Sequence, residues 1–249
     1  MSRNLWIIVV LTCLPLAAWG ARLRLFEVET EGHFLFDVMV ESNMAMSNGL
    51  NDAYDGCYML RVGGTEARWE SASIILGGRG IQTPRIDVGT FKVSRQVFVP
   101  TKGDWARIYD LIVNTTTKAQ TAEVEIFGNL GSDNSTQLTG TSDGDMSLEA
   151  SDTWFATDDY SDGSGDPSLA HVFRRAAGKL RPTTVTLEQD NISVRYQIKL
   201  PPRGRKAIVF FAVQTKTGTE ARALAESLTK FGTDARTNLD AQDIGLIAN

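Results

Sequence analysis

The feature that most restricts the fold is a two-residue alternation of apolar and polar side chains, repeated in short runs from residue 23 to 213. The clearest run places Ser193, Arg195, Gln197 and Lys199 between apolar residues at positions 192, 194, 196, 198 and 200. Clusters of Gly, Asn, Asp and Pro separate the runs, and no long helical pattern interrupts them. We therefore predict an all-β protein with two antiparallel sheets packed as a sandwich.

Other runs locate individual strands. Residues 34–40 place apolar side chains on one face, whereas Arg95 interrupts the apolar face of residues 91–99. Residues 105–113 are largely apolar on both faces and residues 207–213 are apolar on both, which is typical of strands in the middle of a covered sheet. With the alternating residues 122–126, the segment 90–128 is predicted to form a three-strand meander.

The period changes near the carboxyl end of the chain. Ala221, Leu224, Ala225 and Leu228 share one helical face, with Thr219 as the predicted N-cap and Gly232 as a stop. Residues 239–247 are predicted to form another short helix. The expected organisation is a signal peptide at 1–20, a β-sandwich domain at 21–217, and a helical tail at 218–249 that packs on the sandwich or extends from it.

The amino-terminal segment has the pattern of a secretory signal. Arg3 precedes an apolar run at residues 5–18, and Ala18-Trp19-Gly20 provides small residues before a cleavage point at Ala21. The run is shorter than the ~20 residues of a spanning helix, so cleavage is favoured over an uncleaved anchor. Cys57 would then be the single cysteine, and export without disulfides favours the periplasm or cell surface of a Gram-negative bacterium.

The charge pattern reverses sign along the chain. No Lys or Arg occurs from residue 119 to 173, a segment rich in acids, whereas most of the charged residues from 174 to 206 are basic. A formal net charge of −5 argues against a general nucleic-acid binder. The acidic segment is predicted to form loops and short strands at one end of the sandwich, as a binding edge. Its candidate ligand-binding residues are Asp143, Asp145, Trp154, Asp158, Asp159 and Tyr160.

Calcium is the cofactor that this segment would suit, because calcium prefers oxygen ligands. The candidate ligands are Asp158, Asp159, Asp162 and Asp166. Tyr160 occupies a position where an EF-hand loop needs Asp or Asn, so the loop departs from that motif. A solvated acidic loop without metal is the alternative.

Several segments resemble a known fold family. The stretches 93–100, 103–107 and 111–114 resemble the large "supersandwich" domains of the galactose-mutarotase-like class. The stretches 128–133, 141–145 and 165–172 look similar to an uncharacterised module of large secreted, multi-module bacterial proteins. The resemblance covers about residues 55–249. It implies the fold and secretion, and it transfers no catalytic residue to this chain.

Two functions follow as hypotheses. The first is an exported, non-catalytic module that binds a polysaccharide or an envelope protein. Acidic and basic patches would also allow head-to-tail self-association that salt weakens. The second is a carbohydrate-active enzyme, or an accessory domain to one, that uses His171 with Glu149, Asp152 or Asp166 as an acid–base pair. The sequence contains no Gly-x-Ser-x-Gly elbow and no phosphate-binding loop motif.

Overall fold

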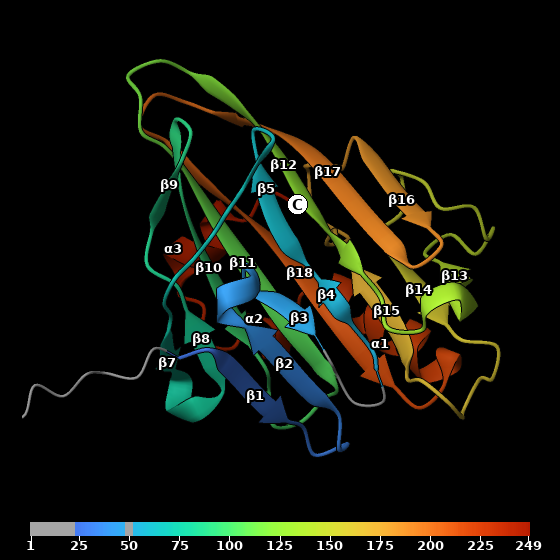
Figure 1. Cartoon of the computed structure of the whole chain (residues 1–249). Helices are drawn as coiled ribbons and strands as arrows, with labels where there is room; N and C mark the ends of the chain where they lie inside the picture. The colour runs from blue at the N-terminus through green and yellow to red at the C-terminus, as the bar shows by residue number, and fades with distance from the viewer. Residues whose placement is uncertain (1–22, 48–51) are drawn as a thin grey trace, which may run out of the picture.

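A computed structural model of the chain describes residues 23–47 and 52–249. The predicted signal peptide at residues 1–20 lies outside the described residues. Within the described part, the strands form three antiparallel sheets with short helices on one side (Figure 1). The predicted all-β sandwich with a helical tail is confirmed.

The largest sheet has nine strands in the order β13-β14-β15-β18-β11-β10-β8-β7, with β9 also paired to β10. Their bounds are β7 Ser73–Ile75, β8 Gly80–Gln82, β9 Ile86–Val88, β10 Phe91–Phe98, β11 Trp105–Asn114, β13 Gln137–Thr141, β14 Trp154–Asp158, β15 Ser168–Val172 and β18 Arg205–Thr215. The long strand β18 lies between β15 and β11, at the centre of the sheet, as its two apolar faces predicted.

The two smaller sheets have five and four strands. The order in the five-stranded sheet is β16-β17-β12-β5-β6, with bounds β5 Met59–Val62, β6 Thr65–Glu66, β12 Gln120–Asn129, β16 Thr184–Glu188 and β17 Asn191–Leu200. The four-stranded sheet contains β1 Leu25–Glu29, β2 Leu35–Met39, β3 Ala45–Ser47 and β4 Asp55–Cys57. Single 3₁₀ turns occur at η1 Val40–Ser42, η2 Leu76–Gly78 and η3 Asp133–Ser135.

One hydrophobic core joins the inner faces of all three sheets. The five-stranded sheet contributes alternate residues such as Val124 and Val194, the nine-stranded sheet contributes Ile108 and Phe210, and the four-stranded sheet contributes Phe36. Each of these side chains is at most 1% exposed. Burying aliphatic and aromatic side chains of this size is the main force that holds the layers together.

The carboxyl-terminal helices cover the opposite face of the nine-stranded sheet (Figure 1). They are α1 Gly218–Thr229, α2 Thr233–Arg236 and α3 Ala241–Leu246. Ala221 and Leu228 of α1 belong to a second apolar cluster with Phe211 of β18 and Tyr109 of β11. This second cluster explains why β11 and β18 are apolar on both faces.

The cap of α1 differs from the sequence prediction. The side chain of Thr217, two residues before the predicted Thr219, accepts a hydrogen bond from the backbone N–H of Glu220. An N-cap hydroxyl reaches the third residue beyond it, so Thr217 satisfies a donor of the first turn. Gly232 lies beyond the end of α1 and precedes α2.

The predicted three-strand meander at residues 90–128 is wrong. Strands β10 and β11 pair with each other, but β12 belongs to the five-stranded sheet, where its neighbours are β17 and β5. The reason is that the two strands differ in which of their faces are apolar. Strand β11 is buried and largely apolar on both faces, whereas β12 has an inner apolar face and an outer face that carries Glu123 and Glu125. A strand with an acidic face fits a sheet with one solvated side.

Arg95, which interrupts the apolar face of β10, forms an ion pair in the interior. Its guanidinium donates to both carboxylate oxygens of Asp110, at 2.7 Å each, and both side chains are buried. The two residues are direct partners in the β10–β11 register. A guanidinium matches a carboxylate with two parallel hydrogen bonds, so neither charge is left unpaired.

Within residues 23–47 and 52–249, no helix has the length and apolar character needed to cross a bilayer.

Candidate functional site

His171, the histidine of the predicted acid–base pair, lies in the interior. It is 1% exposed on β15, and its ring stacks on Phe155 with the ring centroids 4.4 Å apart. Its Nδ1 is 2.6 Å from the Tyr58 hydroxyl and its Nε2 is 3.1 Å from the Thr157 hydroxyl. Burial lowers the pKa of His171 to about 3, so the ring is neutral at ordinary pH.

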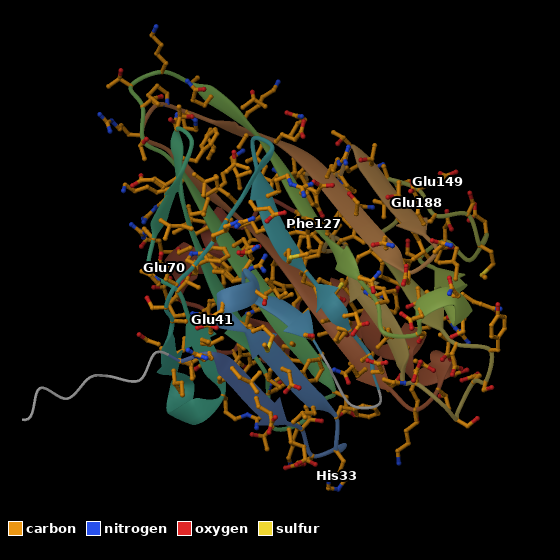
Figure 2. All side chains as sticks on the ribbon, in the orientation of Figure 1. His33, Glu41, Glu70, Phe127, Glu149 and Glu188 are labelled. Atoms are coloured by element: carbon orange, nitrogen blue, oxygen red, sulfur yellow. The ribbon has the colours of Figure 1, made fainter. Side chains whose placement is uncertain are left out.

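The predicted catalytic carboxylates make other contacts. Glu149 is exposed and accepts from the Ser151 hydroxyl, while Asp152 is buried and accepts from Ser142. Asp166 is only partly buried. Figure 2 shows Glu149 on the outer surface of the molecule. His171 has hydroxyls as its hydrogen-bond partners, so the structure does not form the acid–base pair of the enzyme hypothesis.

The acidic segment divides between two places, which corrects the prediction of a single edge. Strands β13, β14 and β15 are consecutive and antiparallel. The loop at 142–153 therefore lies at one end of β14, and the loop at 159–167 lies at the other end. Asp143 and Asp145 belong to the first loop, whereas Asp159 and Tyr160 belong to the second.

Within each loop the carboxylates mainly bond to nearby backbone. Asp143 accepts from the N–H of Asp145, and Asp145 accepts from the N–H of Ser147. In the second loop Asp159 accepts from the N–H groups of Ser161 and Asp166. These are local turn contacts of the kind that Asp side chains commonly make.

The two aromatic candidates differ in exposure. Trp154 is 5% exposed, and its Nε1 is 3.3 Å from a carboxylate oxygen of Glu226 on α1, so it anchors the helix to the sheet. Tyr160 is 73% exposed at the tip of its loop. Of the pair, Tyr160 alone presents a ring to solvent, and a sugar ring could stack there.

The predicted calcium ligands make hydrogen bonds to nearby backbone and hydroxyl groups. Asp158 accepts from the Ser168 hydroxyl and from the N–H of Asp159, and Asp162 accepts from the N–H of Gly218 at the start of α1. The residues that the structure describes include no group of three or more His, Cys, Asp or Glu side chains placed to hold a metal ion. Burial raises the pKa values of Asp158 and Asp166, and neighbouring carboxylates raise them further.

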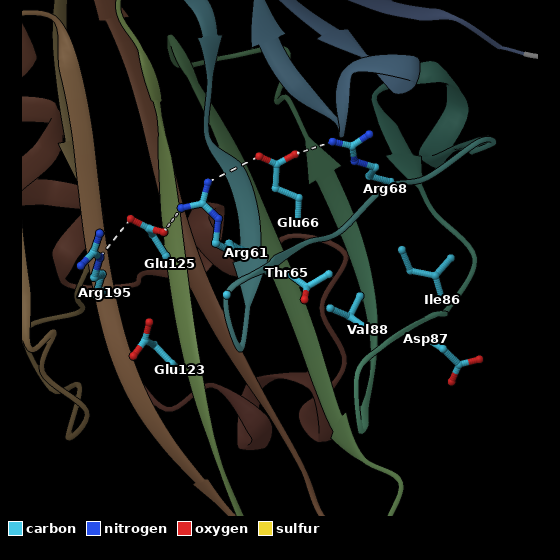
Figure 3. Close-up of a pocket in the computed structure, with 11 residues that line it drawn as sticks. Arg61, Thr65, Glu66, Arg68, Ile86, Asp87, Val88, Glu123, Glu125 and Arg195 are labelled. Atoms are coloured by element: carbon cyan, nitrogen blue, oxygen red, sulfur yellow. Dashed lines mark hydrogen bonds and ion pairs between the residues drawn. The ribbon is translucent and has the colours of Figure 1, made fainter.

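A different region has the geometry of a binding site. An open groove of about 810 Å³ crosses the outer face of the five-stranded sheet and ends against β9 (Figure 3). We call it the charged groove; its lining residues are Arg61, Gly64, Thr65, Glu66, Arg68, Ile86, Asp87, Val88, Glu123, Glu125 and Arg195. Strands β5, β6, β12 and β17 supply its floor, and β9 of the nine-stranded sheet supplies the wall.

Glu125 organises the centre of the charged groove. One carboxylate oxygen accepts from Nε of Arg195 at 3.0 Å and from the Ser193 hydroxyl at 2.7 Å. The other accepts from Arg61. Burial opposes ionisation, but these hydrogen bonds and the two guanidinium charges outweigh it and lower the pKa of Glu125. Glu125 is therefore an anion whose two oxygens are both occupied.

The remaining acids of the groove also have partners. Arg61 and Arg68 both donate to Glu66, at 3.4 and 3.2 Å. Asp87 forms an ion pair with Lys92, which lies outside the lining. Figure 3 shows the resulting chain of alternating charges, from Arg195 through Glu125, Arg61 and Glu66 to Arg68.

An aromatic ring on the same face of the sheet packs against Arg61. The Arg61 guanidinium carbon lies 4.1 Å from the centroid of the Phe127 ring, a cation–π distance (Figure 2 labels Phe127). Arg195 lies at one end of this series of charges. Its side chain is 50% exposed and uses only Nε for Glu125. Glu123 is exposed and accepts from the Gln197 amide at 3.1 Å. Arg195 and Glu123 thus keep hydrogen-bonding capacity for a ligand.

Sequence reasoning placed Arg195 on a polar strand face but did not identify the groove. The alternation at 192–200 showed that Arg195 faces away from the core, and the same holds for Glu123 and Glu125 in β12. The pairing partners at residues 61 and 66 lie far away in sequence. Only the β12–β5 and β12–β17 registers bring the three segments together.

Comparisons with known proteins give structural neighbours only. A scan against protein-family models finds no match, and a search of curated proteins finds none either. The solved structures similar to this chain include galactose-mutarotase-like and aldose 1-epimerase proteins, the class named by the sequence resemblance.

Three of these structures differ in how much of their length the chain matches. A candidate kojibiose phosphorylase from the human microbiome has a TM-score of 0.49 and 11% identity over 85% of this chain; the chain spans 27% of that protein. A candidate aldose 1-epimerase from Escherichia coli K12 has a TM-score of 0.48 and 7% identity, over 77% of this chain and 99% of that one. A polysaccharide lyase has a TM-score of 0.47 and 9% identity over 83% of this chain; the chain spans 34% of that protein.

Proposed function

We propose that this protein is a non-catalytic β-sandwich module that binds a polysaccharide in the charged groove. The observation that carries the proposal is the arrangement of the groove itself: it is open, polar, and built from side chains that are already held in place by one another. A preformed site loses little conformational freedom when a ligand binds.

The charges of the groove favour a ligand that is rich in hydroxyl groups and has little net charge. The acids are paired with arginines, with Lys92 or with the Gln197 amide, so no large excess of either sign remains. Guanidinium groups donate and carboxylates accept, and a sugar hydroxyl does both. Ile86 adds an apolar side chain to the wall, against which the less polar face of a pyranose ring can pack.

The same contacts argue against catalysis in this groove. Glycoside hydrolysis needs one carboxyl group to give a proton and a second one to attack or to activate water. Glu125 is ionised and both of its oxygens accept hydrogen bonds, so it is suited to positioning arginines rather than to reacting. His171, the alternative acid, lies inside the core.

The cellular location is part of the proposal and rests on the amino-terminal sequence pattern. We infer export to the envelope of a Gram-negative bacterium, where polysaccharides are abundant ligands. A tag placed at the carboxyl end would test this by fractionation: the protein should appear in the periplasm or outside the cell, about 20 residues shorter than the translated chain. Full-length protein in the cytoplasm would reject export.

Binding can be tested with defined sugars. We would titrate residues 21–249 with neutral hexasaccharides of glucose, xylose and mannose, by calorimetry. At least one is expected to bind with a Kd of about 1 mM or tighter. Arg195→Ala should weaken that binding about tenfold, because it removes exposed donors from the groove.

Lys199→Ala is the matched control. Lys199 lies on the same strand and outer face as Arg195 but outside the lining of the groove, and its replacement removes the same charge. Equal weakening by both variants would reject the groove as the site. If no hexasaccharide binds and the protein instead forms larger species at low salt that dissociate at high salt, the module is a protein-interaction surface rather than a sugar binder.

Calcium binding by the loop at 158–166, the cofactor hypothesis from the sequence, has a direct test. Because several of its carboxylate oxygens already accept hydrogen bonds from backbone or hydroxyl groups, we expect millimolar calcium to raise the melting temperature by less than about 1 °C. A rise of several degrees that a chelator reverses would support the calcium hypothesis from the sequence.

A further inference from the structure

A second cavity has a different electrostatic character. It encloses about 500 Å³ between the start of β18, the segment that follows β15, and the end of α3. We call it the basic pocket; its lining residues are Arg175, Ala177, Lys179, Leu180, Arg205, Lys206, Gly245, Leu246, Ile247 and Ala248. It lies apart from the charged groove and shares no lining residue with it.

The pocket exists because β18 is longer than its neighbour. Strand β15 pairs with residues 211–215 of β18, which leaves the edge of β18 before Phe211 without a neighbouring strand on that side. The carboxyl-terminal segment partly covers this edge: the N–H of Ala248 donates to the carbonyl of Ala207, and Ile247 forms a parallel bridge with Ala207. At such an edge, consecutive residues from both faces of a strand can border one cavity, as Arg205 and Lys206 do.

Four basic side chains line the pocket and no acidic residue does. Arg175 is held in place, because it donates to the carbonyls of Asn249 and Ile247 at 2.6 and 2.8 Å. The side chains of Lys179, Arg205 and Lys206 make no hydrogen bond or ion pair with another residue that the structure describes. Asp243, the acidic residue within α3, accepts a hydrogen bond from the Tyr109 hydroxyl.

Gathering unpaired positive charges has an energetic consequence. Like charges repel, and the repulsion is stronger near a partly covered surface than in open solvent. An anion would remove that repulsion and gain charge-assisted hydrogen bonds from the lysines and arginines. The remaining walls are apolar, with Leu180, Leu246 and Ile247, so the pocket also suits an organic group attached to the anion.

We propose that the basic pocket binds a phosphate or sulfate ester, with the oxyanion between Lys179, Arg205 and Lys206 and the organic part against Leu180 and Leu246. The volume accommodates a single sugar or a lipid headgroup. A soluble ester and a membrane lipid share this chemistry. The proposal is independent of sugar binding in the charged groove.

The test compares charged and uncharged probes on residues 21–249. Calorimetry at low ionic strength would measure binding of glucose 6-phosphate, glucose 6-sulfate, inorganic phosphate and glucose. The two esters are expected to bind at least about tenfold more tightly than glucose. Cosedimentation with vesicles of phosphatidylglycerol, compared with phosphatidylcholine, tests whether a lipid headgroup is the source of the phosphate.

The decisive variant is Lys179→Ala/Lys206→Ala, which should weaken ester or anionic-vesicle binding about tenfold or more. Lys102→Ala/Lys216→Ala is the matched control: it removes the same charge from exposed lysines that follow β10 and β18, at the other end of these strands. This control should bind as the unmodified protein does. Arg195→Ala, which alters the charged groove, should also retain ester binding.

Three results would overturn the proposal. One is the absence of binding for every anionic probe up to about 10 mM. Another is equal weakening in the two double variants, which would mean that the whole molecule's charge, and not this pocket, attracts anions. The third is loss of ester binding in Arg195→Ala with full binding in Lys179→Ala/Lys206→Ala, which would place the anion in the charged groove.

Discussion

Two of the arginine–carboxylate pairs that join neighbouring antiparallel strands lie in different sheets and in different surroundings. Arg95 pairs with Asp110 across β10 and β11, and Arg195 pairs with Glu125 across β17 and β12; in both cases the two residues are direct register partners. The first pair faces the core and is fully buried. The second faces solvent, with the Arg195 side chain half exposed.

The difference shows how burial decides what a charge pair can do. In the core, each charge has lost its water and depends on its partner, so the pair constrains the structure and has no capacity left for a ligand. In the charged groove, water can replace a lost partner, and Arg195 keeps free donors. The interior pair should therefore affect stability, and the outer pair should affect binding.

The largest expected effect comes from breaking the interior pair. Arg95→Met leaves Asp110 buried without its partner and should lower the free energy of unfolding by about 3–5 kcal/mol. Arg95→Met/Asp110→Leu removes both charges and should recover most of that loss. Urea unfolding of both variants measures it. A single variant that loses less than about 1 kcal/mol would mean that water reaches this pair, and the contrast with the groove would disappear.

His171 should make the interior sensitive to acid. The pKa of His171 is lowered to about 3 in the folded protein, while the unfolded chain takes up the proton below about pH 6.5. At this site the unfolded state therefore binds more protons, so the contribution of His171 to the free energy of unfolding should fall by about 2 kcal/mol between pH 8 and pH 5. His171→Gln should remove this contribution.

His33 provides the control for that measurement. It is exposed, in the turn between β1 and β2, where it contacts Glu29 (Figure 2). His33→Gln replaces an exposed histidine instead, and His171→Gln should change the pH dependence of unfolding more than His33→Gln does. If His33→Gln flattens the curve and His171→Gln does not, the acid sensitivity arises at the surface.

Asp37 is a buried carboxyl group on β2, and its contribution should depend on pH in the opposite sense. Burial and the facing Glu27 raise the pKa of Asp37 to about 6, and its Oδ1 has no hydrogen-bond partner. The folded protein holds this proton more tightly than the unfolded chain, so the contribution of Asp37 to stability decreases as the pH rises from about 4 to 6. Asp37→Asn should raise the free energy of unfolding by about 1 kcal/mol at pH 7 and by much less at pH 4. Unfolding curves at the two pH values measure it, and a loss of stability at pH 7 would contradict the expectation.

The smallest effect on stability is expected in the charged groove. Arg195→Ala should change the free energy of unfolding by less than about 1 kcal/mol, as exposed ion pairs usually do, while it weakens sugar binding. Urea unfolding at the same protein concentration as for Arg95→Met gives the direct comparison. A loss of 3 kcal/mol or more would show that the outer pair supports the fold as the inner one does.

Much of the fold could be predicted because strand periods are local. The one-sided alternation of residues 192–200 and the two-sided burial of residues 207–213 both correspond to observed strands. Which strands become neighbours depends on distant parts of the chain, and the meander prediction failed at β12 for that reason. The prediction that the acidic segment forms a single edge failed for a related reason. Its two loops are close in sequence but lie at opposite ends of β14.

The candidate sites depended still more on tertiary structure. The sequence alone determined that this chain forms strands, which of them have two apolar faces, and that Arg95 and Arg195 interrupt or alternate with apolar residues. Only the tertiary structure decided that Arg95 meets Asp110 inside the core, that Arg195 meets Glu125 beside a groove, and that His171 is covered. The physical reason is that a side chain's charge state and partners depend on which surfaces cover it, and those surfaces come from residues far away in sequence.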